Sequence, residues 1–93
     1  MARFYFFTNH ALIFIHIVRR PKITIRELSN IVGISERTTS KIINDLLGEE
    51  YITKTREGRN NWYRINLGKS ISLPGLESIA AEVLLETLGW KKR

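Results

Sequence analysis

The sequence of 93 residues contains no cysteine, one methionine and two prolines. Without cysteine the chain has no disulfides, no thiolate metal ligands and no thiol nucleophile. Long apolar runs are also absent: the longest unbroken one covers residues 11–15, whereas a membrane-spanning helix needs about 20. Polar residues interrupt the apolar N-terminus and no small-residue cleavage site follows it, so a signal peptide is not expected. These absences favour a soluble, cytoplasmic protein with no membrane partner.

Acidic residues are scarce, because nine Asp and Glu stand against fifteen Lys and Arg, and the formal net charge is +6. A strongly basic chain favours a polyanionic partner such as nucleic acid. Basic residues are dense in residues 51–64, where Glu57 is the only acid, and the basic residues 91–93 are interpreted as a solvated terminus. The acids are scattered, and no serine–histidine–acid order or glycine-rich phosphate loop is present. The sequence therefore predicts neither an enzyme nor a cofactor.

The first half of the chain carries two helix signals. Residues 9–18 are apolar nearly all round and are followed by two arginines and Pro21, which are typical of a helix end. Residues 24–27 have the T-x-x-E pattern of a capping box, and apolar residues at helical spacing follow as far as Gly33. We therefore expect a buried first helix, a short second helix and a tight turn at Gly33, where a positive φ costs little.

A third helix is expected after Ser35, whose side chain can cap it. At 100° per residue, the positions on its core side are Thr39, Ile42, Ile43 and Leu46. The positions on the opposite, polar side are Arg37, Lys41, Asn44 and Gly48, with Ser40 at the margin. One face is thus predicted to pack in the core while the other is free to form hydrogen bonds.

A β-hairpin is predicted after the third helix. Residues 51–56 are rich in β-branched side chains, residues 57–61 favour a turn, and residues 62–67 alternate between apolar and polar. Strand alternation places Tyr63 in the core and Trp62, with Arg64, on the other face.

A final amphipathic helix is predicted after a loop that contains Pro74 and Gly75. Its apolar positions are Leu76, Ile79, Ala80, Val83, Leu84 and Leu88. The order of elements predicts one mostly helical α+β domain over residues 1–93, a winged helix-turn-helix with a three-helix core and a hairpin wing at residues 8–67. Residues 1–7 and 72–90, including the C-terminal helix, are expected to be dimerisation elements.

Four segments carry a resemblance to a known group of proteins. They are ITIREL at residues 23–28, VGISERT at 32–38, YITKTREGR at 51–59 and YRI at 63–65. Together they resemble the winged helix-turn-helix transcriptional regulators of the MarR and ArsR type, over about two-thirds of the chain. The resemblance implies a DNA-binding homodimer whose third helix enters the major groove and whose wing follows the backbone or minor groove.

The sequence departs from that pattern at two positions and in one residue type. Glu50 stands where such proteins usually carry glycine, so the third helix must end either with a strained residue or with a different turn. Thr39 stands where valine or isoleucine is common, so its hydroxyl needs a partner in the core. Metal sensors of the ArsR type generally use cysteines or clustered histidines and carboxylates. Without cysteine the resemblance extends to DNA binding and not to metal sensing.

Candidate DNA-binding residues lie on the third helix and the wing. They are Arg37, Thr38, Ser40, Lys41, Asn44, Lys54, Arg56, Arg59, Asn60 and Arg64. Arg and Lys on the helix suit guanine edges and Asn suits adenine, while Thr38 at the helix start suits a phosphate. On the wing, Arg59 at the tip is best placed for a narrow minor groove, and the strand arginines suit phosphates. The alternatives are an ordinary solvated helix face and, for Asn60 and Asn61, simple turn chemistry.

Apolar residues at both ends of the chain are candidates for a dimer interface. They are Phe4, Tyr5, Phe6, Phe7, Leu84, Leu85 and Leu88. The alternative is that they pack on the core of their own chain. His10 and His16 are six residues apart, on different sides of a helix, so they are not expected to share a metal. For His10 we expect a local hydrogen bond near the helix start.

Two other functions fit a winged helix-turn-helix. The fold could be an interaction module for a protein or RNA partner, but this predicts an acidic or apolar third-helix face, and the face here is polar and cationic. It could also be a non-specific architectural DNA binder, which predicts strong salt dependence with little difference between sequences. The sequence indicates no small-molecule effector.

Overall fold

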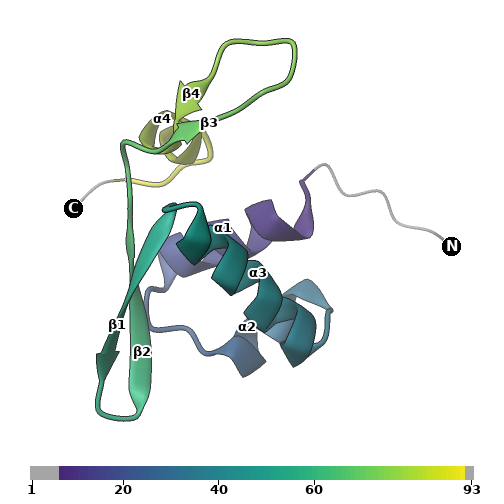
Figure 1. The fold of residues 1–93 in the computed structure, drawn as a ribbon, viewed down its shortest axis with the longest axis vertical. Helices are drawn as coiled ribbons and strands as arrows, with labels where there is room; N and C mark the ends of the chain where they lie inside the picture. The colour runs from purple at the N-terminus through teal and green to yellow at the C-terminus, as the bar shows by residue number, and fades with distance from the viewer. Residues whose placement is uncertain (1–6, 92–93) are drawn as a thin grey trace, which may run out of the picture.

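The computed structural model describes residues 7–91, so Phe4, Tyr5 and Phe6 of the expected dimer interface lie outside the described residues. The elements are α1 (Asn9–Arg19), α2 (Ile25–Val32), α3 (Glu36–Gly48), β1 (Ile52–Glu57), β2 (Asn60–Ile65), β3 (Ser70–Ile71), β4 (Ile79–Ala80) and α4 (Ala81–Thr87). Three helices form the body, the β1–β2 hairpin projects from one end, and β3, β4 and α4 lie at the other (Figure 1). This is the predicted mostly helical α+β architecture of a winged helix-turn-helix, with a helix at its C-terminal end.

The first two helices begin and end where the sequence predicts. The hydroxyl of Thr8 caps α1 by accepting the Ala11 N–H at 3.3 Å. At the start of α2, Thr24 and Glu27 each accept the other's backbone N–H, so the capping box is confirmed. Gly33 ends α2 in the left-handed conformation with φ 82°. This turn sets the angle between α2 and α3.

The predicted faces of α3 are also confirmed. Ser35 caps the helix by accepting the Thr38 N–H at 3.0 Å, and the core positions named above are all buried. Thr39 is among them, and its hydroxyl donates to the Ser35 carbonyl oxygen at 2.9 Å. The buried hydroxyl therefore has a partner within the helix, which is how the core accepts threonine at this position.

Glu50 ends α3 in a strained conformation, with φ 64°. The N–H of Tyr51 donates to the Leu46 carbonyl at 2.9 Å, and the N–H of Glu50 donates to that of Leu47 at 3.1 Å. This pair of bonds is the Schellman motif, in which the residue at the Glu50 position is usually glycine. Of the two expected outcomes at this helix end, the structure shows the strained residue. The turn directs the chain from α3 straight into β1.

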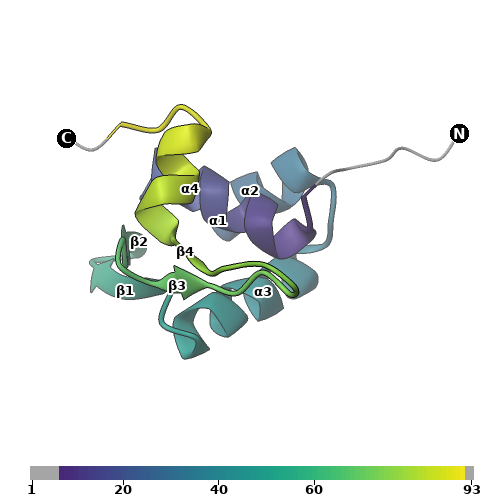
Figure 2. The same cartoon turned by 90° about the horizontal axis from the view of Figure 1, so that it is seen from above.

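One core joins the helices to the wing and to α4. Its buried apolar residues are Ile13, Phe14, Ile17, Val18, Ile23, Leu28, Ile42, Ile43, Leu46, Ile52, Tyr63, Ala81 and Leu85. Figure 2 shows α1 in the middle, with α3 on one side and α4 on the other. Tyr63 attaches β2 to this body, because its ring is buried and its N–H donates to the Pro21 carbonyl at 2.9 Å. Burial also raises the pKa of the Tyr63 hydroxyl.

The wing is a regular antiparallel hairpin with a shorter turn than predicted. The pairs run from Ile52 opposite Ile65 to Glu57 opposite Asn60, so only Gly58 and Arg59 form the turn. The prediction of a turn over residues 57–61 was therefore wrong at both ends. Gly58 has φ 63°, and Arg59 has no positive φ, which is the pattern of a type II′ hairpin turn. The backbone twist of such a turn matches the twist of the two strands, so β1 and β2 remain paired up to the residues that flank the turn, Glu57 and Asn60.

The C-terminal prediction was wrong in extent. The helix was expected to begin near Leu76, but Ile79–Ala80 forms β4, which pairs with β3, and α4 begins only at Ala81. The first N–H groups of α4 donate to loop carbonyls instead of a preceding turn: Ala81 to Lys69 at 2.8 Å and Glu82 to Leu67 at 3.1 Å. These long-range hydrogen bonds satisfy the free N–H groups at the start of α4. They favour a helix that begins at Ala81, although the helical spacing of apolar residues begins earlier, at Leu76.

Candidate nucleic-acid interface

The outer face of α3 carries the candidate base-contacting residues. Arg37, Lys41 and Asn44 are exposed, and their spacing of four and three residues places them along one side of the helix. Ser40 is half-buried beside them. Thr38 is exposed at the helix start, where its hydroxyl accepts a hydrogen bond from Ser35 Oγ at 2.9 Å. The structure therefore brings the predicted helix residues together on one surface.

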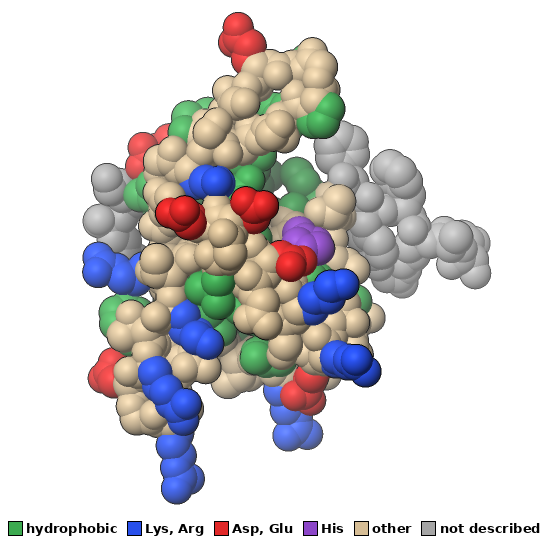
Figure 3. Space-filling view, viewed as in Figure 1, with side chains coloured by type: hydrophobic (Ala, Val, Ile, Leu, Met, Phe, Trp, Pro, Cys, Tyr) green, Lys and Arg blue, Asp and Glu red, His purple; other side chains and the backbone are tan. Residues whose placement is uncertain are grey.

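Charge is divided along this helix. The N-terminal half carries Arg37 and Lys41 together with Glu36 in its first turn. Towards its C-terminal end the charges are all acidic: Asp45 in the helix, and Glu49 and Glu50 directly after it. In Figure 3 the blue Lys and Arg side chains gather over the lower part of the molecule and most red Asp and Glu side chains lie above them. The surface suited to a polyanion is thus the N-terminal half of α3 together with the wing.

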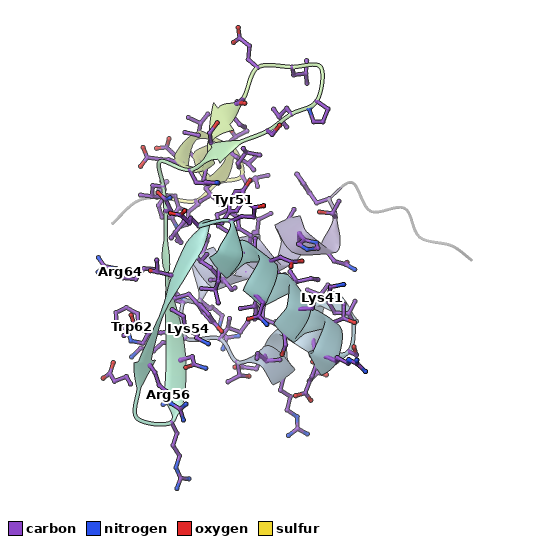
Figure 4. The ribbon with its side chains drawn as sticks, viewed as in Figure 1. Lys41, Tyr51, Lys54, Arg56, Trp62 and Arg64 are labelled. Carbon is purple, nitrogen blue, oxygen red and sulfur yellow. The ribbon has the colours of Figure 1, made fainter. Side chains whose placement is uncertain are left out.

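The register of the wing divides its basic residues between two faces. Residues directly opposite in a hairpin point to the same side, so Lys54 opposite Tyr63 and Arg56 opposite Asn61 share the face of buried Ile52. Arg64, opposite Thr53, lies on the other face with Trp62, as alternation predicted. Figure 4 shows Lys54 on the side of the hairpin toward α3, and Trp62 and Arg64 on the side away from it.

The tip of the wing presents Arg59. It is exposed beside Gly58 in the two-residue turn, and Asn60 follows as the first residue of β2. Arg56 lies close by, and its Nε donates to the Gly58 carbonyl at 3.2 Å, which folds this side chain back onto the turn. Of the two arginines, Arg59 therefore reaches farther from the body.

The indole of Trp62 is half-buried on the outer face of the wing, where it pairs with Thr55 and lies in a shallow pocket with Arg20, Pro21 and Lys22. Its Nε1 is buried and has no hydrogen-bond partner. The ring therefore contributes apolar contact and no hydrogen bond within the described chain.

Two side-chain interactions between distant parts of the chain were not predicted. His10 Nε2 lies 2.8 Å from Asp45 Oδ2, so His10 bonds across from α1 to α3 and the expected local hydrogen bond was wrong. Lys69 Nζ lies 5.2 Å from the centre of the Tyr51 ring. No local pattern indicates either contact, because the partners are far apart in the sequence.

The described apolar residues of the candidate dimer interface differ in exposure. Leu85 is 1% exposed and packs in the core of its own chain, and Phe7 and Leu84 are half-buried. Val83 is 51% exposed on α4, and Leu88, the residue just after this helix, is also exposed. Leu76 is 74% exposed in the loop before β4. The apolar surface available to a partner is therefore at Leu76, Val83 and Leu88 more than at Leu85.

The described residues offer neither a membrane-spanning helix nor a cluster of metal ligands. Within residues 7–91 no helix is long and apolar enough to cross a membrane. Over the same residues, His, Asp and Glu side chains form no group of three that could hold a metal ion.

Residues 10–53 match the family model described as winged helix-turn-helix DNA-binding. The matched segment runs from α1 to the start of β1, so it includes the helix-turn-helix and the outer face of α3. No curated protein is significantly similar to the chain. The chain therefore has the fold of a winged helix-turn-helix, and its residues 10–53 match a model of winged helix-turn-helix DNA-binding domains.

Proposed function

We propose that the protein is a transcriptional regulator that binds double-stranded DNA sequence-specifically as a homodimer. The third helix, α3, enters the major groove, where each base pair offers a distinct set of hydrogen-bonding groups. The wing follows the backbone or the minor groove. The resemblance to regulators of the MarR and ArsR type supports this proposal, without their metal sensing.

One observation carries the proposal: the exposed polar row of α3 and the face of the wing that is turned toward the helices both carry basic side chains. Arg37, Lys41 and Asn44 form the row on the helix, and Lys54 and Arg56 lie on the hairpin face turned toward the helices. In this arrangement Arg37 and Lys41 donate to guanine O6 and N7, and Asn44 pairs with adenine N6 and N7. If the outer face of α3 were only an ordinary solvated surface, there would be no reason to expect basic residues on the adjacent face of the wing as well.

Ser40, at the margin of the same row, also reaches a base edge. Other candidate residues contact the DNA backbone: Thr38, at the N-terminus of α3, donates to a phosphate, and Asn60 does so beside the wing tip. Arg59 enters the minor groove, where a narrow groove has the most negative potential. Arg64 lies on the far face of the wing, so its contribution is a long-range attraction that salt screens.

A dimer is proposed because one winged-helix module reads only a few base pairs. Two modules related by a two-fold axis read two half-sites about one helical turn, or 34–36 Å, apart. The exposed apolar side chains of Leu76, Val83 and Leu88 support a contact through the C-terminal end of the chain. The aromatic residues Phe4 to Phe7 are proposed to extend it.

The test is selection of preferred duplexes from a random pool, followed by titration of selected and random duplexes of equal length across salt. Sequence-specific binding predicts a conserved, two-fold symmetric motif and an affinity at least about 10³-fold above that for random duplex. Equal affinity for all duplexes with a steep salt dependence would instead identify an architectural binder. Absence of duplex binding by the folded protein would favour an interaction module.

A further inference from the structure

A cavity of about 230 Å³ lies between the helix-turn-helix body and the C-terminal unit. Its apolar walls come from α1, α3, β3 and α4, and include Phe14, Ile15, Leu46, Ile71 and Leu84. Figure 3 shows a hollow with hydrophobic side chains at its floor in the upper half of the molecule, apart from the basic lower part. An apolar cavity of about 150 Å³ in another protein is large enough to bind benzene. This cavity therefore has room for a small aromatic molecule.

The cavity is lined by two acidic residues and one histidine, and by no lysine or arginine. Asp45 lies on α3 and Glu49 follows one turn later as the capping residue of that helix, and His10 bonds to Asp45 at 2.8 Å. Among the described residues no ion pair engages Glu49, which is exposed. A carboxylate beside an apolar cavity attracts a cationic group of the occupant, which keeps its own charge near water.

The rings in the wall favour an aromatic occupant. Phe14 and Tyr51 both line the cavity and meet edge to face, with their centres 5.8 Å apart. Aromatic rings add attraction to one another beyond the area they bury. Tyr51 also attracts a cation in this protein, since Lys69 lies over its ring without lining the cavity.

We propose that this cavity binds a small aromatic molecule that carries one positive charge, such as an arylalkylamine. Its ring lies against Phe14, Leu46 and Leu84, and its ammonium group lies at the mouth near Asp45 and Glu49. The site is separate from the proposed DNA surface, but it borders the C-terminal half of the same helix, α3. The proposal concerns binding by this chain alone and does not depend on the proposed function.

The test uses two probes of similar size and opposite charge, 2-naphthylmethylamine and 2-naphthoate. Each is titrated into the full chain at neutral pH while the methyl resonances of Leu46, Ile71 and Leu84 are followed by NMR. We expect saturable shifts with the amine and at least about tenfold weaker binding of the carboxylate, because two carboxylates attract one probe and repel the other. No saturable shift with the amine, or equal binding of both probes, would overturn the proposal.

Two variants locate the site. Ala11→Phe places a ring in the cavity from α1 and is expected to abolish binding of both probes. Asp45→Asn combined with Glu49→Gln retains the apolar walls, so the preference for the amine should fall toward equality while carboxylate binding rises. Both substituted acids are exposed, and circular dichroism checks that the double variant is folded. A double variant that keeps the full preference for the amine would contradict the proposed position of the ammonium group.

Discussion

Lys54 lies directly opposite Tyr63 in the wing, and the exposed ammonium group and the buried ring occupy the same face of the hairpin. Tyr63 is held twice, by its place in the core and by its N–H bond to Pro21. Because side chains alternate along a strand, this anchor determines where every other wing residue points. Lys54 and Arg56 must share the face turned toward the helices, and Arg64 must lie on the other.

Removing a basic side chain from the wing is expected to affect DNA binding differently on its two faces. Arg56→Ala is expected to weaken binding to every duplex and to reduce the slope of log K against log salt by about 1, the effect of one lost phosphate contact. Arg64→Ala removes the same charge from the far face and should change the slope by clearly less. Fluorescence anisotropy at several salt concentrations measures both. Equal slopes for the two variants would show that the hairpin face does not determine contact.

Glu50 is expected to limit stability. Its φ of 64° strains any residue with a Cβ, so Glu50→Gly should raise the free energy of unfolding by about 1 kcal/mol. Glu49→Gly is a matched control, because Glu49 is also an exposed acid but has φ −90°. There glycine only adds backbone freedom to the unfolded chain and should destabilise. Urea unfolding of the two variants should therefore give changes of opposite sign, and changes of the same sign would refute the strain argument.

The sequence predicts the helical body well because its signals are local. The capping box at Thr24 and Glu27, the turn at Gly33 and the cap at Ser35 each satisfy backbone groups within a few residues. Thr39 lies on the buried face of α3 and Arg37 on the exposed face, and this assignment depends only on the 100° turn per residue of a helix. For the same reason the sequence alone places the row of candidate DNA-binding residues on one face of α3.

Features that depend on distant contacts could not be predicted. The start of α4 depends on carbonyl groups of Leu67 and Lys69, more than ten residues earlier, and on the pairing of β3 with β4. His10 meets Asp45 across 35 positions. Strand alternation correctly separated Trp62 from Tyr63, but the direction of each face relative to α3 follows from the packing of Tyr63 in the core.

Glu27 is expected to make stability depend on pH. Its carboxylate accepts the Thr24 N–H at 3.1 Å and pairs with Arg20 at 2.9 Å, and both interactions lower its pKa from the ordinary 4.5. The unfolded chain keeps the ordinary pKa, so this contribution is complete above about pH 4.5 and is lost as pH falls through the lowered value. The difference in Tm between the wild type and Glu27→Gln should therefore narrow below this pH.

Thermal unfolding from pH 7 to pH 3 measures this difference. Glu77→Gln is the control, since Glu77 is exposed in the loop before β4 and has no ion pair among those found in residues 7–91. It should leave Tm almost unchanged at every pH. A gap between the wild type and Glu27→Gln that stays constant down to pH 3 would contradict the role of the carboxylate.

The proposed dimer contact is tested at Val83. This side chain is 51% exposed on α4, so Val83→Asp should leave the fold intact and raise the dimer dissociation constant at least about tenfold, by placing a charge in an apolar contact. Ser72→Asp adds the same charge at an exposed position after β3 and should not affect association. Sedimentation equilibrium distinguishes the two. Unchanged association of the Val83 variant would exclude this face of α4 from the interface.

The most direct measurement is the affinity of Arg37→Ala and Arg59→Ala for a selected duplex and for random duplex across salt. Arg37→Ala is expected to lose about 1–3 kcal/mol on the selected duplex and to relax the preference for bases near its contact. Arg59→Ala should weaken both duplexes alike and flatten the salt dependence. If both variants bind the selected duplex as tightly as the wild type does, neither α3 nor the wing contacts DNA in the proposed way.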